Sequence, residues 1–347
     1  MKIVAVGDSF VPVEVFRQGF ADLEHAHEVQ YMQLDESKAF RPTTDSERSI
    51  REFLGTPSQL ADRVGDADIL AVHGAPVTDE VLGAGSRLKL VCCARGGPVN
   101  VDVKAASARR LPVVNSPGKN ADAVADQTIA FMVMLARGFP RAQRFLLEGG
   151  RLGESAYEGA RFLGHELGSH VLGLVGYGNV GRRVARRAIA FGMTVVAYDP
   201  FLQADDLGGV PLLPSLAALL EVADFVSLHV RASADTENLF GRSEFAAMRP
   251  GSYFINTARE TLVDEAALDS ALASGNLAGA ALDVVRPNSA GGPHPLLKHA
   301  NVVITPHIGG ATHETLLRGV TMIAAEIKRF AAGEPLQAVV NRTAIQV

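Results

Sequence analysis

The stretch HVLGLVGYGNVG, residues 170–181, decides the fold of this 347-residue chain. Its apolar first half, 170–175, predicts a buried strand, and the glycines that follow predict a tight turn that opens into a helix near Arg182. A second apolar run, 193–198, predicts the next strand, which ends at Asp199. A strand, a crossover helix and a second strand form a βαβ unit, and such units build parallel sheets.

The glycine spacing G-x-G-x-x-G in this context predicts a dinucleotide site. Gly176 permits the tight turn, Gly178 lets the backbone approach a pyrophosphate, and Gly181 lets the helix pack on the strand. The free N–H groups at the helix start favour phosphate, and Asp199 suits the ribose hydroxyls of NAD. The residues predicted here to bind NAD are Gly176, Tyr177, Gly178, Asn179, Val180, Gly181 and Asp199.

The rest of the chain repeats the same alternation of strands and helices on both sides of this stretch. Expected strands in the first third are 2–6, 28–32, 69–73, 88–94 and 113–115, with helices such as 11–23 and 78–84 between them. A long helix is expected at 121–138 and another at 312–332, and the alternation resumes over 169–306. The fold class expected is therefore α/β, with two doubly wound parallel-sheet domains.

The composition excludes several functional classes. The net charge of -5 gives no basic surface for nucleic acid, and no apolar run approaches the roughly 18 residues that span a membrane. Residues 1–8 predict a first strand rather than a signal peptide. Cys92 and Cys93 are adjacent and lie in an apolar run, so we expect core residues and no metal site. A cytoplasmic location is expected.

Four later apolar runs each deliver a polar residue where a strand should end. They are SLHV at 227–230, FINTAR at 254–259, AALDVV at 280–285 and NVVITPHIGGAT at 301–312. Open parallel sheets bind ligands at the carboxyl ends of their strands. The polar residues so placed are His229, Arg259, Asp283 and His307.

With these segments in place, the sequence resembles the D-2-hydroxyacid dehydrogenase family over essentially its whole length. The motifs NTAR at 256–259 and TPHIGG at 305–310, at this spacing after the glycine turn, carry the resemblance. It implies a flavodoxin-like substrate-binding domain from 1–116 and 312–347 and a Rossmann NAD domain from 117–311. It also implies a homodimer with a dimerisation arm at about 121–165, and a hydroxyacid or ketoacid substrate.

The resemblance also implies a role for each matching residue. Arg259 would hold the substrate carboxylate through its guanidinium fork, and His307 would be the general acid and base beside the nicotinamide. Asp283 would contact the nicotinamide end of NAD. The other positions that would line the cofactor are His229, Thr257, Ala258, His307 and Gly309.

The chain departs from the family pattern at the position that usually holds a glutamate next to the catalytic histidine. Asn288 stands there, so His307 would be oriented by an amide without charge and would have a lower pKa than in glutamate-bearing relatives. Formate dehydrogenases also have an amide there, which keeps a formate-type reaction as one alternative. A corepressor-like protein that senses NAD(H) without turnover is another.

The substrate loop after the fourth strand is about two residues shorter than in the family. Gly96 and Gly97 would still offer backbone N–H groups to a carboxylate, and Arg95 lies beside them. We expect Arg95, together with Arg286, to bind a second anionic group of a phosphoglycerate-like substrate, unless both are solvated loop residues. The identity of the substrate, the physiological direction and the exact oligomeric state stay open.

Overall fold

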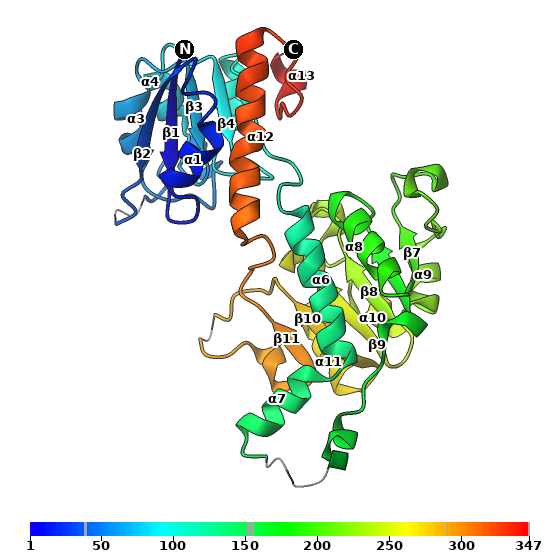
Figure 1. Ribbon diagram of the computed structural model, residues 1–347. Coiled ribbons are helices and arrows are strands. Elements are labelled where there is room, and N and C mark those ends of the chain that lie inside the picture. The colour runs from blue at the N-terminus through cyan, green and yellow to red at the C-terminus, as the bar shows by residue number, and fades with distance from the viewer. Residues whose placement is uncertain (38–39, 151–152, 154–155, 290, 346–347) are drawn as a thin grey trace. The chain divides into compact units, whose positions relative to one another are not determined.

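The computed structural model describes residues 1–37, 40–150, 153, 156–289 and 291–345 (Figure 1). The chain divides into two compact units. Unit 1 comprises Met1–Asn120 and Ala311–Val347, and unit 2 comprises Ala121–Gly310. The divisions thus fall at 120/121 and 310/311, where the sequence predicted 116/117 and 311/312.

Unit 1 contains a five-stranded parallel sheet with the order β2-β1-β3-β4-β5. Because the chain adds β2 on one side of β1 and β3 to β5 on the other, the sheet is doubly wound, as predicted. The strands are β1 (Lys2–Gly7), β2 (Glu28–Gln33), β3 (Ile69–Val72), β4 (Leu90–Cys93) and β5 (Val113–Val114).

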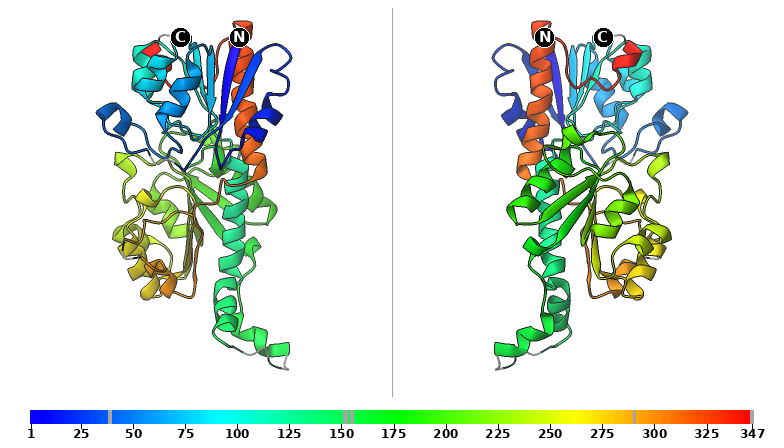
Figure 2. Two further views of the ribbon diagram at one scale, coloured as in Figure 1. Left: turned by 90° about the vertical axis from the view of Figure 1, so that its left-hand side faces the viewer. Right: turned by 90° about the vertical axis from the view of Figure 1, so that its right-hand side faces the viewer.

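Helices cover both faces of the unit 1 sheet (Figure 2). The long helix α12, which follows unit 2 in the chain, belongs to this unit and packs beside α1 on one face, where Val320, Ile323 and Ile327 join the core. Helices α3, α4 and α5 bury Leu60, Val81 and their neighbours against the other face. The helices are α1 (Val13–Phe20), α2 (Asp45–Arg48), α3 (Pro57–Val64), α4 (Asp79–Ala84), α5 (Val103–Ala108), α12 (His313–Ala332) and α13 (Arg342–Ile345).

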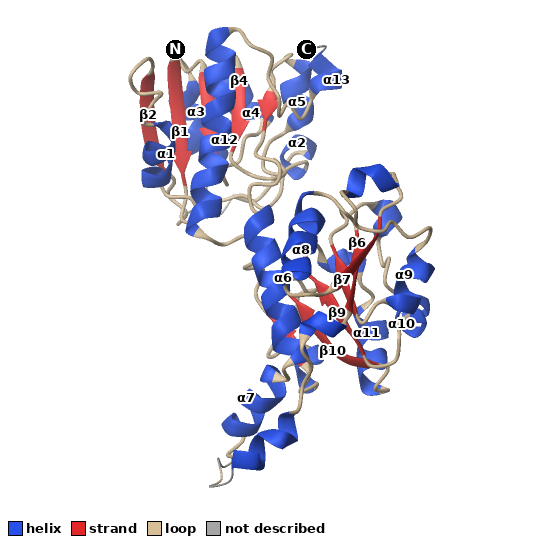
Figure 3. Ribbon diagram, turned by 45° about the vertical axis from the view of Figure 1, so that its right-hand side comes forward, coloured by secondary structure: helices blue, strands red, loops and turns tan. Residues whose placement is uncertain are grey.

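Unit 2 contains a six-stranded parallel sheet with the order β11-β10-β9-β8-β6-β7 (Figure 3). The winding direction reverses between β6 and β8, and such a reversal point is where open α/β sheets bind ligands. The strands are β6 (Val171–Val175), β7 (Thr194–Tyr198), β8 (Phe225–Leu228), β9 (Ser252–Asn256), β10 (Leu277–Leu282) and β11 (Val302–Ile304).

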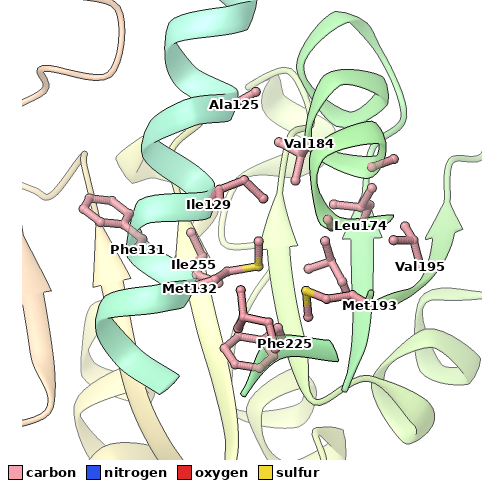
Figure 4. Close-up of a cluster of buried hydrophobic side chains, with 14 of the residues drawn as sticks. Ala125, Ile129, Phe131, Met132, Leu174, Val184, Met193, Val195, Phe225 and Ile255 are labelled. Atoms are coloured by element: carbon pink, nitrogen blue, oxygen red, sulfur yellow. The ribbon is translucent and has the colours of Figure 1, made fainter. Parts of the chain in front are cut away.

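Helices α6 and α8 lie side by side on one face of the unit 2 sheet. Their buried side chains, among them Ile129, Met132 and Val184, meet Leu174 and Phe225 of the strands (Figure 4). The other face is covered by α9, α10 and α11. The bounds are α6 (Ala121–Ala136), α8 (Asn179–Ala190), α9 (Leu216–Val222), α10 (Arg242–Ala247) and α11 (Glu265–Ala273).

The arm that follows α6 contains helix α7 (Phe139–Leu147), in which no residue is buried. Short 3-10 helices complete the secondary structure: η1 (Ala156–Phe162), η2 (Leu167–Ser169), η3 (Ala204–Leu207), η4 (Ala234–Thr236), η5 (Glu260–Leu262) and η6 (Pro295–Lys298). Among the described helices, none combines the length and the apolar character needed to cross a membrane.

Helix starts follow local sequence signals. The side chain of Thr312 accepts a hydrogen bond from the Thr315 amide at the start of α12, and Asp102 does the same for α5 through the Ala105 amide. Such caps satisfy N–H groups that the helix itself leaves free. Helices predicted to begin at 312 and 78 therefore begin one residue later, because Thr312 and Thr78 are the caps.

Candidate active site

The glycine turn of unit 2 connects β6 to α8 in the geometry that a pyrophosphate requires. Gly176 has a φ of 94°, and a Cβ there would lie 2.8 Å from the carbonyl oxygen of His229. A Cβ on Gly181 would lie 2.4 Å from the Gly176 oxygen. Both positions therefore exclude any side chain.

Gly178 differs from these two glycines, because a Cβ there would meet no atom within 4 Å. It is the N-cap of α8, and no described side chain caps the first amides of this helix. The open space and the free N–H groups of Asn179 and Val180 suit phosphate oxygens. The turn thus fits the pyrophosphate of a dinucleotide.

Asp199 is held at the end of β7 beside this turn. Its Oδ2 accepts a hydrogen bond from the Tyr177 amide at 2.9 Å, and its Oδ1 accepts one from the Phe201 amide at 3.0 Å. The side chain of Tyr177 is buried, and its hydroxyl donates to the Leu207 oxygen at 3.1 Å. Tyr177 therefore acts on the site through its backbone, while Asp199 presents a carboxylate that suits ribose hydroxyls and repels a 2'-phosphate.

His229 follows β8, directly across the reversal point from the glycine turn. Its amide donates to the Val175 oxygen at 2.8 Å, and its Nε2 lies 3.0 Å from the Ser227 hydroxyl. Burial lowers the pKa of His229 to about 3, so the imidazole is neutral at any working pH. A neutral imidazole with so low a pKa is unsuited to proton transfer, and the contact of His229 with the cofactor stays a prediction.

The turn after β9 carries Arg259 and is shaped by Asn256, which the sequence reasoning did not single out. Asn256 accepts a hydrogen bond from the Ala258 amide at 3.0 Å and donates one to the Arg259 oxygen at 2.8 Å. Thr257 is buried, with its hydroxyl 3.2 Å from that of Thr128. Two signals in the sequence could have identified Asn256: it is a polar residue at the end of an apolar strand, and it is the first residue of the NTAR motif.

The Arg259 side chain is exposed at this turn. Its guanidinium donates to the Ala258 oxygen at 2.7 Å, and its other donors make no hydrogen bond to a described residue. A guanidinium with free donors can hold a carboxylate in bidentate fashion.

Asp283 follows β10 and is almost fully buried, with 2% of its surface exposed. Its Oδ1 accepts hydrogen bonds from the Gln127 amide at 2.9 Å, the Thr305 hydroxyl at 2.6 Å and the Ile308 backbone at 2.9 Å. Its Oδ2 accepts one from the Gly309 backbone at 2.8 Å. The carboxylate therefore fixes the turn after β11, and its contact with the nicotinamide stays a prediction.

His307 lies in the middle of that turn, with an exposed side chain. Its backbone has a φ of 55°, in the left-handed region, and its amide donates to the Asp283 oxygen at 2.8 Å. A non-glycine residue persists there only where its surroundings hold it. A Cβ on Gly309 would lie 2.8 Å from Asp283 Oδ2, so glycine is needed for this close approach. Gln127, the α6 residue that completes the cluster, had no signal in the sequence.

Asn288 lies in the exposed loop after β10. Its amide donates to the oxygens of Gly291 at 2.7 Å and Pro293 at 3.1 Å. In the same loop, the Arg286 guanidinium donates to the Asn238 side chain at 3.1 Å. Asn288 thus shapes its own loop, and the expected contact with His307 stays a prediction.

The residues predicted to bind substrate from unit 1 lie after β4. Arg95 forms an ion pair with the Glu52 carboxylate and donates to the Glu52 carbonyl oxygen at 2.6 Å. The amides of Gly96 and Gly97 donate no hydrogen bond within the described part of the chain. Because Glu52 already neutralises Arg95, these two amides are the freer donors. No cluster of metal ligands occurs among the described residues.

Together these features define a dinucleotide-binding protein of the dehydrogenase type. They are a parallel sheet with an uncapped glycine turn, a carboxylate suited to ribose, and an arginine and a histidine on turns at the ends of the strands. Residues 129–309 match the model for the D-isomer specific 2-hydroxyacid dehydrogenase, NAD binding domain. The chain belongs to the D-isomer specific 2-hydroxyacid dehydrogenase family, and its cofactor is NAD.

The chain is similar to several relatives of known name. It is 36% identical to D-3-phosphoglycerate dehydrogenase of Methanocaldococcus jannaschii over 289 residues, which are 82% of this chain and 54% of that protein. It is 37% identical to glyoxylate reductase of Korarchaeum cryptofilum over 83% of this chain and 87% of that protein. The chain therefore spans about half the length of the phosphoglycerate dehydrogenases it matches.

Solved structures show the same fold. A crystal structure of a Thermus thermophilus protein aligns with a TM-score of 0.76 at 32% identity, covering 98% of this chain and 100% of that chain. The structure of D-2-hydroxyisocaproate dehydrogenase aligns with a TM-score of 0.79 at 24% identity, covering 98% and 99% of the two chains. The second likeness concerns the fold alone.

Proposed function

We propose that this protein is an NAD-dependent dehydrogenase that interconverts a D-2-hydroxyacid and the corresponding 2-ketoacid. The observation that carries the proposal is the turn that contains His307, which three hydrogen bonds hold to the buried carboxylate of Asp283 at the carboxyl end of the sheet. Gln127 of α6 donates a fourth hydrogen bond to the same carboxylate. Such support suits a residue that must present a proton in one place.

The roles follow from the chemistry of each side chain. When bound, the nicotinamide supplies or receives the hydride. Arg259 has free donors to hold the substrate carboxylate, which orients the reacting carbon. In reduction, protonated His307 gives its proton to the keto oxygen, and in oxidation the neutral ring takes it back. Asp283 and Gln127 act by positioning His307, while neutral His229 takes no part in proton transfer.

Turnover of 2-ketoacids tests the proposal. Purified protein is mixed with NADH and glyoxylate, hydroxypyruvate, pyruvate or phosphohydroxypyruvate, and loss of NADH absorbance is followed. At least one ketoacid should be reduced, and His307→Gln should lower kcat at least about a hundredfold while NADH still binds. His25→Gln, which changes an exposed histidine of unit 1, is the matched control.

Two outcomes would overturn the proposal. NADH binding without turnover of any ketoacid would favour the dinucleotide-sensing alternative. Oxidation of formate with NAD, without ketoacid reduction, would favour the formate-type reaction that the amide of Asn288 left open.

We further propose a homodimer in which the arm meets a second copy of the chain. Helix α7 buries none of its residues, and apolar side chains are exposed on it and on the segment of chain beyond it, with Leu147 80% and Leu163 79% exposed. Exposed apolar groups gathered on one segment mark an interface. Light scattering should give twice the chain mass, and Leu147→Glu should give monomer where Val222→Glu does not. A cytoplasmic location belongs to the same proposal.

A further inference from the structure

At the carboxyl end of its sheet, unit 1 buries a lysine for which the described residues provide no counter-ion. Lys119 is 7% exposed, and its ammonium donates to the Ala94 oxygen at 2.7 Å. It forms no salt bridge with any described residue. A buried ammonium has three donors and a large desolvation cost, so one carbonyl is an incomplete set of partners.

The charged neighbours of Lys119 do not supply the missing anion. Burial raises the pKa of the Asp8 carboxyl, but the hydrogen bond and charge of His73 and the backbone amides outweigh it, so that pKa lies below its usual value. Asp8 is ionised, yet His73 Nδ1 and the amides of Phe10, Val11 and Gly74 already donate to its oxygens. Arg95 is a cation paired with Glu52.

The remaining titratable group beside Lys119 is a thiol. Burial raises the pKa of Cys93 to about 11, so the thiol is neutral. Burial also lowers the pKa of Lys119 to about 8, which still leaves the ammonium mainly protonated at pH 7. Within the described part of the chain, therefore, no carboxylate forms an ion pair with this ammonium, and the charge of Asp8 acts on it without contact.

The surrounding backbone keeps space for this side chain. Gly319 of α12 faces it, and a Cβ there would lie 2.8 Å from Lys119 Cδ and 3.0 Å from the Ala94 oxygen. Ser116 donates to the Gly319 oxygen, and Arg318 donates to the Lys119 oxygen, so the turn that carries the lysine is fixed on α12. The position of the ammonium is thus defined by contacts within unit 1.

The free amides of Gly96 and Gly97 lie just beyond Ala94, the residue whose oxygen holds the ammonium. A Cβ on Gly97 would meet no atom within 4 Å, so a ligand oxygen can approach that backbone. These two N–H groups follow, by two and three residues, the carbonyl group that holds the ammonium. Backbone N–H donors and an ammonium are the groups from which proteins build oxyanion sites.

We propose that Lys119 is the anion-binding residue of unit 1, and that with the amides of Gly96 and Gly97 it receives a carboxylate or phosphate group of the substrate. Lys119 thereby receives the anion-binding role that the sequence analysis predicted for Arg95. The Arg95 guanidinium is already paired with Glu52, whereas Lys119 forms no salt bridge with a described residue. That the ligand is a substrate rests on the proposed function, whereas anion binding itself does not.

Binding of simple anions to the full chain without NAD tests the site. Calorimetric titration with oxalate and with inorganic phosphate should show binding to the wild type, and Lys119→Met should weaken it at least about tenfold. Lys119→Gln is the informative second variant, because it keeps a donor for the Ala94 oxygen but loses the charge. It should bind as weakly as Lys119→Met, while Lys104→Met, at an exposed lysine of unit 1, should bind normally.

Wild-type affinity in Lys119→Gln would overturn the proposal and leave the lysine as a structural tether to Ala94. Kinetics then separate the two possible sources of the anion. A uniform fall in kcat/KM for all ketoacids in Lys119→Gln assigns Lys119 to the carboxylate next to the keto group. A fall confined to phosphohydroxypyruvate assigns it to a distal phosphate. Lys119-dependent anion binding without any turnover would instead contradict the proposed function alone.

Discussion

Replacing Asp283 with asparagine should uncouple the His307 turn from the sheet. Asparagine has the same shape, and its amide oxygen can replace Oδ1 as the acceptor for Gln127, Thr305 and the Ile308 backbone. Its NH2 group then stands where Oδ2 accepts the Gly309 amide. Two donors face each other, and one buried N–H loses its partner.

The magnitude follows from these four bonds. An unsatisfied buried donor costs about 1–3 kcal/mol, and the three retained bonds each weaken when a charged acceptor becomes neutral. Relief of carboxylate desolvation opposes this loss. We expect a net destabilisation of about 3 kcal/mol, which lowers the melting temperature of a unit of this size by roughly 6–12 °C.

The assay is thermal unfolding followed by circular dichroism, together with steady-state kinetics. Asp235→Asn, which removes the same charge from an exposed position of η4 in unit 2, should change the stability by less than about 0.5 kcal/mol. Because Asp283→Asn displaces His307, kcat should fall while the affinity for NADH stays within a few-fold. Normal melting and normal kcat in Asp283→Asn would refute the view that this carboxylate positions the catalytic turn.

Three further predictions concern single residues. Arg259→Lys should raise KM for the ketoacid and lower kcat/KM, and the fall in kcat/KM should correspond to about 2–4 kcal/mol of lost interaction with the substrate carboxylate. Fluorescence titrations should show an unchanged affinity for NADH. Because Asp199 repels a 2'-phosphate, kcat/KM should be higher with NADH than with NADPH, and equal values would contradict that role. The pKa of Lys119 in the folded protein, about 8, lies below its ordinary value of 10.5, so folding favours the neutral amine. The free energy of unfolding of the wild type should therefore rise by up to about 3 kcal/mol as the pH rises from about 8 to 10.5. Lys119→Met should lack this gain, as urea unfolding at pH 7.5 and pH 10.5 in anion-poor buffer will show.

The sequence alone predicted the fold class because its signals are local. Apolar runs of strand length and the glycine turn at 176–181 each act within a few residues of themselves. The same locality placed Asp199, Arg259, Asp283 and His307 at strand ends. It gave less accurate ends for elements: the strand predicted at 88–94 is Leu90–Cys93, because hydrogen bonding to its neighbours and not apolar character sets its length.

Only the tertiary structure decided which polar groups satisfy one another. Gln127 and Asp283 are 156 residues apart in the chain, yet their side chains are hydrogen-bonded once α6 packs on the sheet. Lys119 reads in the sequence as an ordinary turn lysine, and becomes a buried cation only because Gly319 of α12 covers it. Such pairs form only when segments that are distant in the chain pack against each other. The sequence pattern therefore does not show which buried donors have an acceptor within the protein and which are available to bind a ligand.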